Sequence, residues 1–153
     1  MNYRSISMAK TIILVIILVR LFAISAWAAP PLPVVEVYKS PSCGCCGKWV
    51  DHLKANGFRV VTHNTDDVMK HKHRLGVPAG LGSCHTAEVG GYLVEGHVPA
   101  AEIKRLLKER PNVKGLTVPA MPMGSPGMEG DHKDSYDVLV INRDGSSETY
   151  AHY

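Results

Sequence analysis

Residues 34–46 read Val34-Val35-Glu36-Val37-Tyr38-Lys39-Ser40-Pro41-Ser42-Cys43-Gly44-Cys45-Cys46. The valine-rich start of this stretch predicts a strand over 34–39, followed by a turn and by a helix with Ser42 as its N-cap. The three cysteines then stand at the beginning of that helix. Free N–H groups and the helix dipole stabilise thiolates there. Thiolate is the form of cysteine that attacks disulfides, and it is also the form that binds metal ions.

The elements that follow this motif come in a regular order. The helix is expected to end at Asn56-Gly57, before a second strand at 58–63 and a second helix at 66–75. Strands at 84–89 and 92–97 flank Gly90-Gly91 as a hairpin, and a third helix begins with Pro99 as its first residue and closes before Pro111. The order β-α-β-α-β-β-α predicts an α/β, thioredoxin-like core over residues 34–111.

A C-terminal extension, residues 112–153, is expected to pack on this core as part of the same domain. Residues 112–135 are rich in Gly, Pro and Met and predict an irregular loop, with the methionines inside 119–130. Two strand patterns within 136–152 flank Asp144-Gly145, which is a strong hairpin signal.

The first 28 residues have the layout of a secretory signal peptide. Arg4 and Lys10 precede an apolar run, and Ala26-Trp27-Ala28 supplies a cleavage site before the Pro-rich linker 29–33. We therefore expect the protein to be exported. The alternative is an uncleaved N-terminal anchor, for which the apolar run is short.

The charge balance of the chain is set largely by this N-terminal segment. Residues 1–28 hold three of the 17 basic residues and none of the 14 acidic ones, so the rest of the chain carries 14 of each. A formally neutral domain gives no reason to expect nucleic acid as a partner, nor a membrane after cleavage.

The four cysteines leave several chemistries open. In an exported protein they first suggest two disulfides, but the adjacent Cys45 and Cys46 do not fit a simple framework. Cys43 and Cys46 have the C-x-x-C spacing of a redox pair or of metal ligands. Cys45 joins the same site only if the first helical turn is loosened, or if it faces a second metal ion. A structural disulfide with a spare thiol is the remaining alternative.

Strand directions bring two more residues toward the cysteine motif. In a thioredoxin-like sheet the third strand runs antiparallel to the first, so Cys84 at its start lies beside the end of strand one. The fourth strand runs back again, so His97 at its end reaches the same place. His85 follows Cys84, and strand alternation would send it to the opposite face, which makes it a weaker candidate. Cys84 as a buried apolar cysteine, and His97 as a capping or solvated histidine, are the alternatives.

A methionine-rich loop points to the kind of metal. The loop contains three thioethers within eight residues, those of Met121, Met123 and Met128. The stretch is rich in Gly and Pro, and the methionines do not have helical spacing. Thioether sulfur is neutral and soft, which favours Cu(I) over zinc. Four thiolates would be neutralised by four Cu(I) ions, and a neutral cluster is cheaper to bury than a charged one. Methionines that only pack on the domain are the alternative.

The motifs together resemble the CopG-type family of periplasmic copper-resistance proteins, long catalogued as a domain of unknown function. The matching stretches are Tyr38 through Cys46, Ser83-Cys84-His85-Thr86-Ala87, Gly91 through Pro99, and Met121 through Met128. The resemblance implies a thioredoxin-like fold with an extension and a cysteine-bridged copper cluster that interconverts Cu(I) and Cu(II) and feeds periplasmic copper export. It implicates Cys43, Cys45, Cys46 and Cys84, with Met121 and Met128 from the extension.

We therefore predict a periplasmic copper-binding protein of copper resistance, with copper ions as its ligands and a copper exporter or chaperone as a partner. The predicted metal ligands are Cys43, Cys45, Cys46, Cys84, His97, Met121, Met123 and Met128. The rivals are a thiol–disulfide oxidoreductase that uses Cys43 and Cys46, a passive Cu(I) chaperone, and a zinc-stabilised structural domain. The oxidoreductase leaves Cys45 and the methionine loop without a role.

Overall fold

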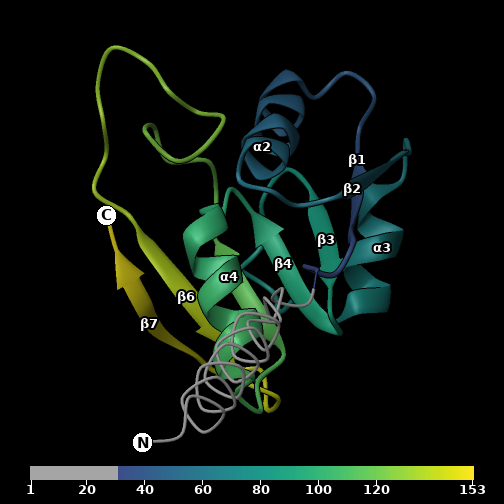
Figure 1. Cartoon of the computed structure of the whole chain (residues 1–153), viewed down its shortest axis with the longest axis vertical. Coiled ribbons are helices and arrows are strands. Elements are labelled where there is room, and N and C mark those ends of the chain that lie inside the picture. Colours follow the sequence, from purple (N-terminus) through teal and green to yellow (C-terminus); the bar gives the residue numbers. More distant parts are fainter. Residues whose placement is uncertain (1–30) are drawn as a thin grey trace, which may run out of the picture. The chain divides into compact units, whose positions relative to one another are not determined.

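The computed structural model describes residues 31–153, in which seven strands and three helices are formed (Figure 1). The predicted signal peptide, residues 1–28, and the first residues of the linker lie outside the described range. The elements are, in chain order, β1 (Val35–Lys39), α2 (Gly44–Ala55), β2 (Val60–Asn64), α3 (Val68–Leu75), β3 (Thr86–Val89), β4 (Tyr92–Gly96), α4 (Ala100–Glu109), β5 (Gly115–Val118), β6 (Asp137–Ile141) and β7 (Ser147–His152).

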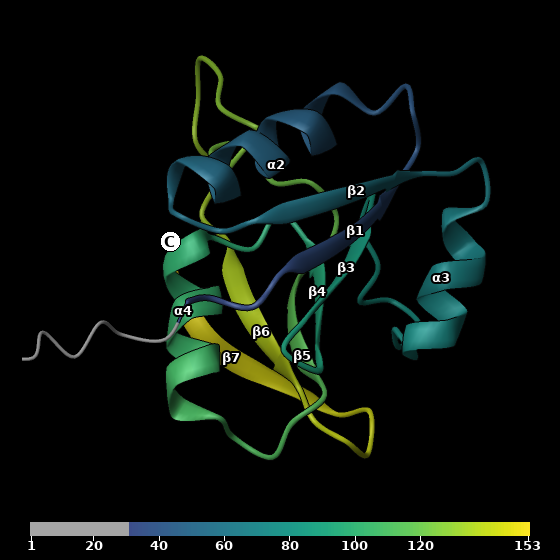
Figure 2. The same ribbon diagram turned by 45° about the vertical axis from the view of Figure 1, so that its right-hand side comes forward.

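All strands belong to one twisted sheet in the order β2-β1-β3-β4-β5-β6-β7 (Figure 2). Strand β1 pairs in parallel with β2 and antiparallel with β3, and β4 runs antiparallel to β3. The predicted α/β, thioredoxin-like fold is therefore confirmed, together with the strand directions on which the placement of Cys84 and His97 depended. Both the end of β1 and the end of β4 reach one edge of the sheet.

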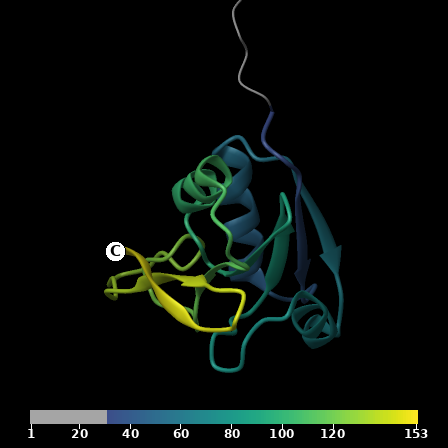
Figure 3. The same cartoon turned by 90° about the horizontal axis from the view of Figure 1, so that it is seen from below.

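Helices cover both faces of this sheet (Figure 3). Val35 and Val37 point to the face that α2 and α4 cover, where they join a core with Trp49, Leu53 and Ile103. Tyr38, which alternates with them along β1, stacks instead on His71 of α3 with ring centroids 4.0 Å apart. The strand period of two thus separates the α2/α4 side from the α3 side.

Strand β5 corrects one prediction, because residues 112–135 were expected to form an irregular loop throughout. Gly115–Val118 pairs in parallel with β4 and antiparallel with β6, and all four residues are buried. Its sequence gives little signal because it is short and begins with glycine. A Cβ at Gly115 would clash with the carbonyl oxygen of Leu93, so this close approach of two strands requires glycine. Residues 119–135 contain no helix or strand, and β6 and β7 form the predicted hairpin.

The described residues contain no helix that is both long and apolar enough to cross a membrane. Helix α4 begins one residue later than predicted, with Pro99 as its N-cap rather than its first residue.

Candidate metal centre

Helix α2 begins at the cysteine motif, one residue later than the sequence predicted. The N-cap is Cys43 rather than Ser42, and its sulfur accepts a hydrogen bond from the Cys46 N–H at 3.4 Å. The Ser42 hydroxyl is instead engaged with the Ser40 hydroxyl, 3.0 Å away, inside the preceding turn. The Cys43 sulfur therefore sits directly on the positive end of the helix dipole.

Cys43 and Cys46 form a disulfide, whereas Cys45 and Cys84 are free thiols. The structure thus shows the C-x-x-C pair in its oxidised state. Reduction by two electrons and two protons would return two more thiols to the same place.

All four sulfurs converge, although they come from two separate segments. They lie within 4.8 Å of one another, with Cys46 Sγ 3.4 Å from Cys84 Sγ and Cys43 Sγ 3.5 Å from Cys45 Sγ. Cys45 joins the site because Cys43 caps the helix instead of lying inside it, so Cys45 falls within the first turn. The sequence argument about strand directions placed Cys84 at this edge, and the structure brings it there.

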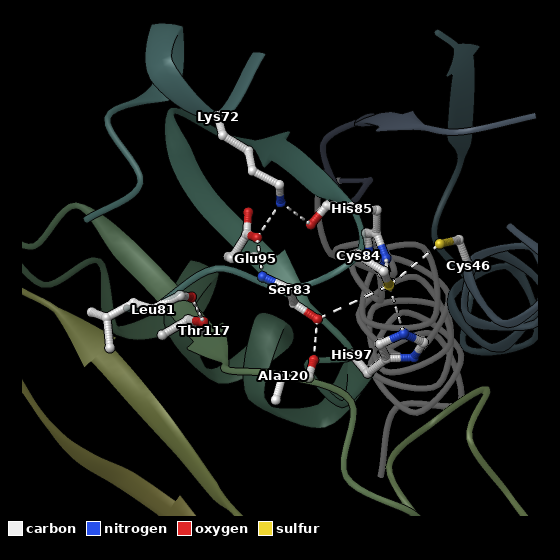
Figure 4. Close-up of polar contacts among 10 residues, drawn as sticks. All are labelled: Cys46, Lys72, Leu81, Ser83, Cys84, His85, Glu95, His97, Thr117 and Ala120. Carbon is white, nitrogen blue, oxygen red and sulfur yellow. Dashed lines mark hydrogen bonds and ion pairs between the residues drawn. The ribbon is translucent and has the colours of Figure 1, made fainter. Parts of the chain in front are cut away.

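His97 lies directly beside Cys84. Its Nε2 is 3.0 Å from Cys84 Sγ (Figure 4). Its Nδ1 is 2.7 Å from the carbonyl oxygen of Pro126. A carbonyl can only accept a hydrogen bond, so Nδ1 carries the proton and Nε2 presents its lone pair to the sulfur cluster. This arrangement is the usual one for a metal-binding histidine, whose second nitrogen is fixed by an outer partner.

His85 lies at the site too, contrary to the alternation argument. Strand β3 begins only at Thr86, so Ser83, Cys84 and His85 form a bend where strand alternation does not apply. His85 Nδ1 is 3.3 Å from Cys84 Sγ, and the fully buried ring packs against Trp49 and His97. Its Nε2 is buried without a hydrogen-bond partner among the described residues. Cys84 is therefore shared by the four-sulfur group and by a second group with the two histidines.

Burial governs the protonation of these groups. It raises the pKa of the Cys84 thiol to about 11, and the neighbouring Cys45 adds to the effect. Burial also lowers the pKa of His97, although the hydrogen bond to Pro126 opposes this, and it holds the pKa of His85 well below the usual range. Both imidazoles are therefore neutral at pH 7. The Cys84 thiol is likewise uncharged at pH 7.

The methionine-rich loop reaches the cysteine motif through its backbone. A Cβ at Gly127, whose φ is +89°, would lie 2.7 Å from the Cys45 carbonyl oxygen and 2.8 Å from the Trp49 nitrogen. Only glycine fits this contact, because both the space and the dihedral exclude a side chain. With Pro126 bonded to His97, residues 126–127 are held against the start of α2.

The three methionines of the loop lie in different surroundings. Met121 is 46% exposed and lines a surface cavity of about 350 Å³ together with Tyr136 and Leu139, and none of the four cysteines lines it. The Met123 methyl group lies close to Gly130 within the loop itself. Met128 is partly buried, and its backbone bonds to Gly124 and Ser125.

Comparison with known proteins supports a copper-related identity. A family model described as a protein of unknown function, DUF411, matches residues 81–128, which include Cys84, His97 and the methionine loop. No curated protein matches this chain.

Two solved structures of a copper-resistance protein, CopG, are similar over nearly their whole length. Form 2 shares 49% sequence identity with a TM-score of 0.76 and covers 81% of this chain and 99% of its own. Form 1 shares 48% identity with a TM-score of 0.75 and covers 80% of this chain and 98% of its own. The chain therefore belongs to the CopG family of copper-resistance proteins.

Proposed function

We propose that this protein binds copper in the periplasm through a cluster of its four cysteines. The observation that carries the proposal is the convergence of four sulfurs within 4.8 Å of one another, next to the lone pair of the buried His97 imidazole. Soft thiolates with one or two imidazoles select Cu(I) or zinc over hard cations. The CopG relatives are copper-resistance proteins, and this favours copper.

More than one ion fits the arrangement better than a single ion. Cys84 belongs to two donor groups at once, one with three cysteines and one with His85 and His97. A thiolate sulfur can bridge two metal ions, so the shared position suits a multinuclear centre. Charge leads to the same conclusion, because several monovalent ions are needed to neutralise four thiolates at a partly buried site. We propose Cys43, Cys45, Cys46, Cys84 and His97 as ligands.

The methionine loop is proposed as a lid that supplies further soft ligands. Its backbone at Pro126 and Gly127 is held at the site, whereas Met121 in the present arrangement faces a separate cavity. Ligation by Met121, Met123 or Met128 would therefore accompany metal binding and closure of the loop. A lid that limits water would also tune the copper potential and allow Cu(I) and Cu(II) to interconvert.

The cellular setting follows from residues 1–28, which we propose as a cleaved signal peptide before the linker 29–33. The thioredoxin-like core 34–111 and the extension 112–153 then form one exported domain. In that compartment the protein would hold copper for an exporter or a chaperone, either as a redox centre or as a passive carrier.

The experiment that tests copper binding is an anaerobic Cu(I) titration of the reduced protein against a competing chelator, repeated with Zn(II). Several tightly bound Cu(I) ions, with all four thiols protected from alkylation, are expected. Weak Cu(I) binding, or tighter binding of Zn(II) than of Cu(I), would overturn the proposal.

A thiol–disulfide oxidoreductase is the second candidate, favoured by the disulfide between Cys43 and Cys46 at the start of α2. It predicts that the reduced, metal-free protein reduces insulin with turnover. The copper proposal predicts little turnover, because Cys45 and Cys84 crowd the pair from both sides.

A further inference from the structure

A buried ion pair contacts the backbone of both residues next to Cys84 in the sequence. Lys72 of α3 donates to Glu95 of β4, and neither side chain has more than 8% of its surface exposed. The same Glu95 oxygen, Oε1, accepts the Ser83 N–H at 2.6 Å, and the Lys72 ammonium donates to the His85 carbonyl at 3.1 Å (Figure 4). The residues immediately before and after Cys84 are therefore each tied to one member of the pair.

This pair is poorly explained by stability alone. One carboxylate oxygen of Glu95, Oε2, is buried without a hydrogen-bond partner among the described residues. A buried ion pair whose hydrogen bonds are incomplete commonly contributes no net stability relative to apolar residues of similar size. What the pair does provide is directional hydrogen bonds to two backbone groups.

The bend that carries Cys84 needs such support, because it lies before β3 and outside the regular strand pairing. Gly96 shows how closely it is packed: a Cβ there would lie 2.6 Å from the Ser83 Cβ and 2.5 Å from the Val118 carbonyl oxygen. The His85 carbonyl also accepts the Gly96 N–H at 3.2 Å. With Ser83 and His85 both fixed, the Cys84 sulfur is directed toward Cys46 and His97 (Figure 4).

We propose that Lys72 and Glu95 are positioning residues for Cys84, which keep its sulfur in register with the other three before and after copper binds. This inference rests on the proposed copper function. Partners that orient a metal ligand without touching the metal typically account for a 10–100-fold change in affinity. Lys72 and Glu95 reach the ligand through the backbone on either side of it rather than through the ligand side chain.

The test is the double variant Lys72→Met/Glu95→Leu, which replaces the pair by apolar side chains and removes both backbone tethers. We expect it to fold, with Cu(I) affinity lowered 10–100-fold in chelator competition. Alkylation of the copper-loaded protein, mapped by mass spectrometry, should label Cys84 while Cys43, Cys45 and Cys46 stay protected. General loss of stability would instead expose all four cysteines together.

A matched control is Glu102→Gln on α4, which perturbs another buried carboxylate, one that accepts a hydrogen bond from the Tyr153 hydroxyl at 2.9 Å. It should leave copper affinity and the alkylation pattern unchanged. If the double variant does not fold, Glu95→Gln takes its place: it removes the charge on which Lys72 depends, keeps an oxygen for the Ser83 N–H, and should still leave Cys84 more reactive than the other three cysteines in the copper-loaded protein. A folded variant that binds copper as the wild type does, with Cys84 protected, would overturn the inference. Wild-type protein that binds no Cu(I) would instead overturn the proposed function.

Discussion

His97 connects the cysteine cluster to the methionine-rich loop, since its Nε2 lies 3.0 Å from Cys84 Sγ while its Nδ1–H donates a hydrogen bond to the Pro126 carbonyl oxygen. One imidazole therefore contacts the proposed metal centre on one side and its proposed lid on the other. A change in metal occupancy at Cys84 has a direct route to the loop.

Replacing His97 should weaken copper binding and loosen the loop together. His97→Leu removes both ring contacts, so we expect Cu(I) affinity to fall at least about tenfold and hydrogen exchange at Gly127 and Met128 to accelerate. Chelator competition and exchange mass spectrometry measure the two effects. His132→Gln, at an exposed histidine of the same extension, is the control. Unchanged affinity in His97→Leu would remove His97 from the site.

Gly127 should be essential to the fit of the loop on α2. Gly127→Ala adds a methyl group that would lie 2.7 Å from the Cys45 carbonyl oxygen, so the loop must shift and copper affinity should fall. Gly145→Ala is a closely matched control, because its φ of +88° carries the same strain of about 1–2 kcal/mol but its Cβ would meet open space. Equal copper affinity in the two variants would show that the contact with Cys45 does not matter for binding.

The methionines should matter for copper and not for zinc. In the double variant Met121→Leu/Met128→Leu we expect weaker Cu(I) binding with Zn(II) binding unchanged, since thioether sulfur is a good ligand only for the softer ion. Met69→Leu, at a methionine on α3 that is 58% exposed, controls for general effects of the substitution. Identical Cu(I) affinities for all three proteins would leave the loop as a cover without ligands.

Trp49 should contribute strongly to stability. The fully buried indole donates to the Val98 carbonyl oxygen at 2.9 Å, just after β4. Trp49→Phe leaves that carbonyl buried without a partner and removes volume from the core. We therefore expect the free energy of unfolding, measured in urea, to fall by about 1–3 kcal/mol. Tyr150→Phe, which removes an exposed hydroxyl contact to Glu109, should change stability by less than about 0.5 kcal/mol. Similar losses in both variants would contradict this account of the core.

The sequence was sufficient to predict the convergence of Cys84 and His97, because that step needed only strand directions. Once β3 runs antiparallel to β1, the segment before it must meet the end of β1, whatever the side chains are. Strand β5 was missed since four residues beginning with glycine carry almost no periodic signal. The predicted position of the His85 side chain was wrong because β3 begins at the next residue, so the alternation of strand side chains does not extend to His85.

The Lys72–Glu95 pair that supports Cys84 could not be predicted from the sequence, for a different reason. Glu95 is a single charged residue within an otherwise apolar strand, which indicates a buried partner, but Lys72 lies 23 residues earlier on a helix full of charges. No local pattern singles it out. In the same way, the contact of Gly127 with α2 depends on the path of an irregular loop, and no period fixes that path.

X-ray absorption at the copper edge of the Cu(I)-loaded, reduced protein is the decisive measurement for a multinuclear copper–thiolate centre. We expect copper surrounded mainly by sulfur, with a copper–copper contribution that shows a multinuclear centre, and loss of that contribution in Cys84→Ser. A single copper ion bound mainly through nitrogen or oxygen, with the spectrum unchanged in Cys84→Ser, would contradict it.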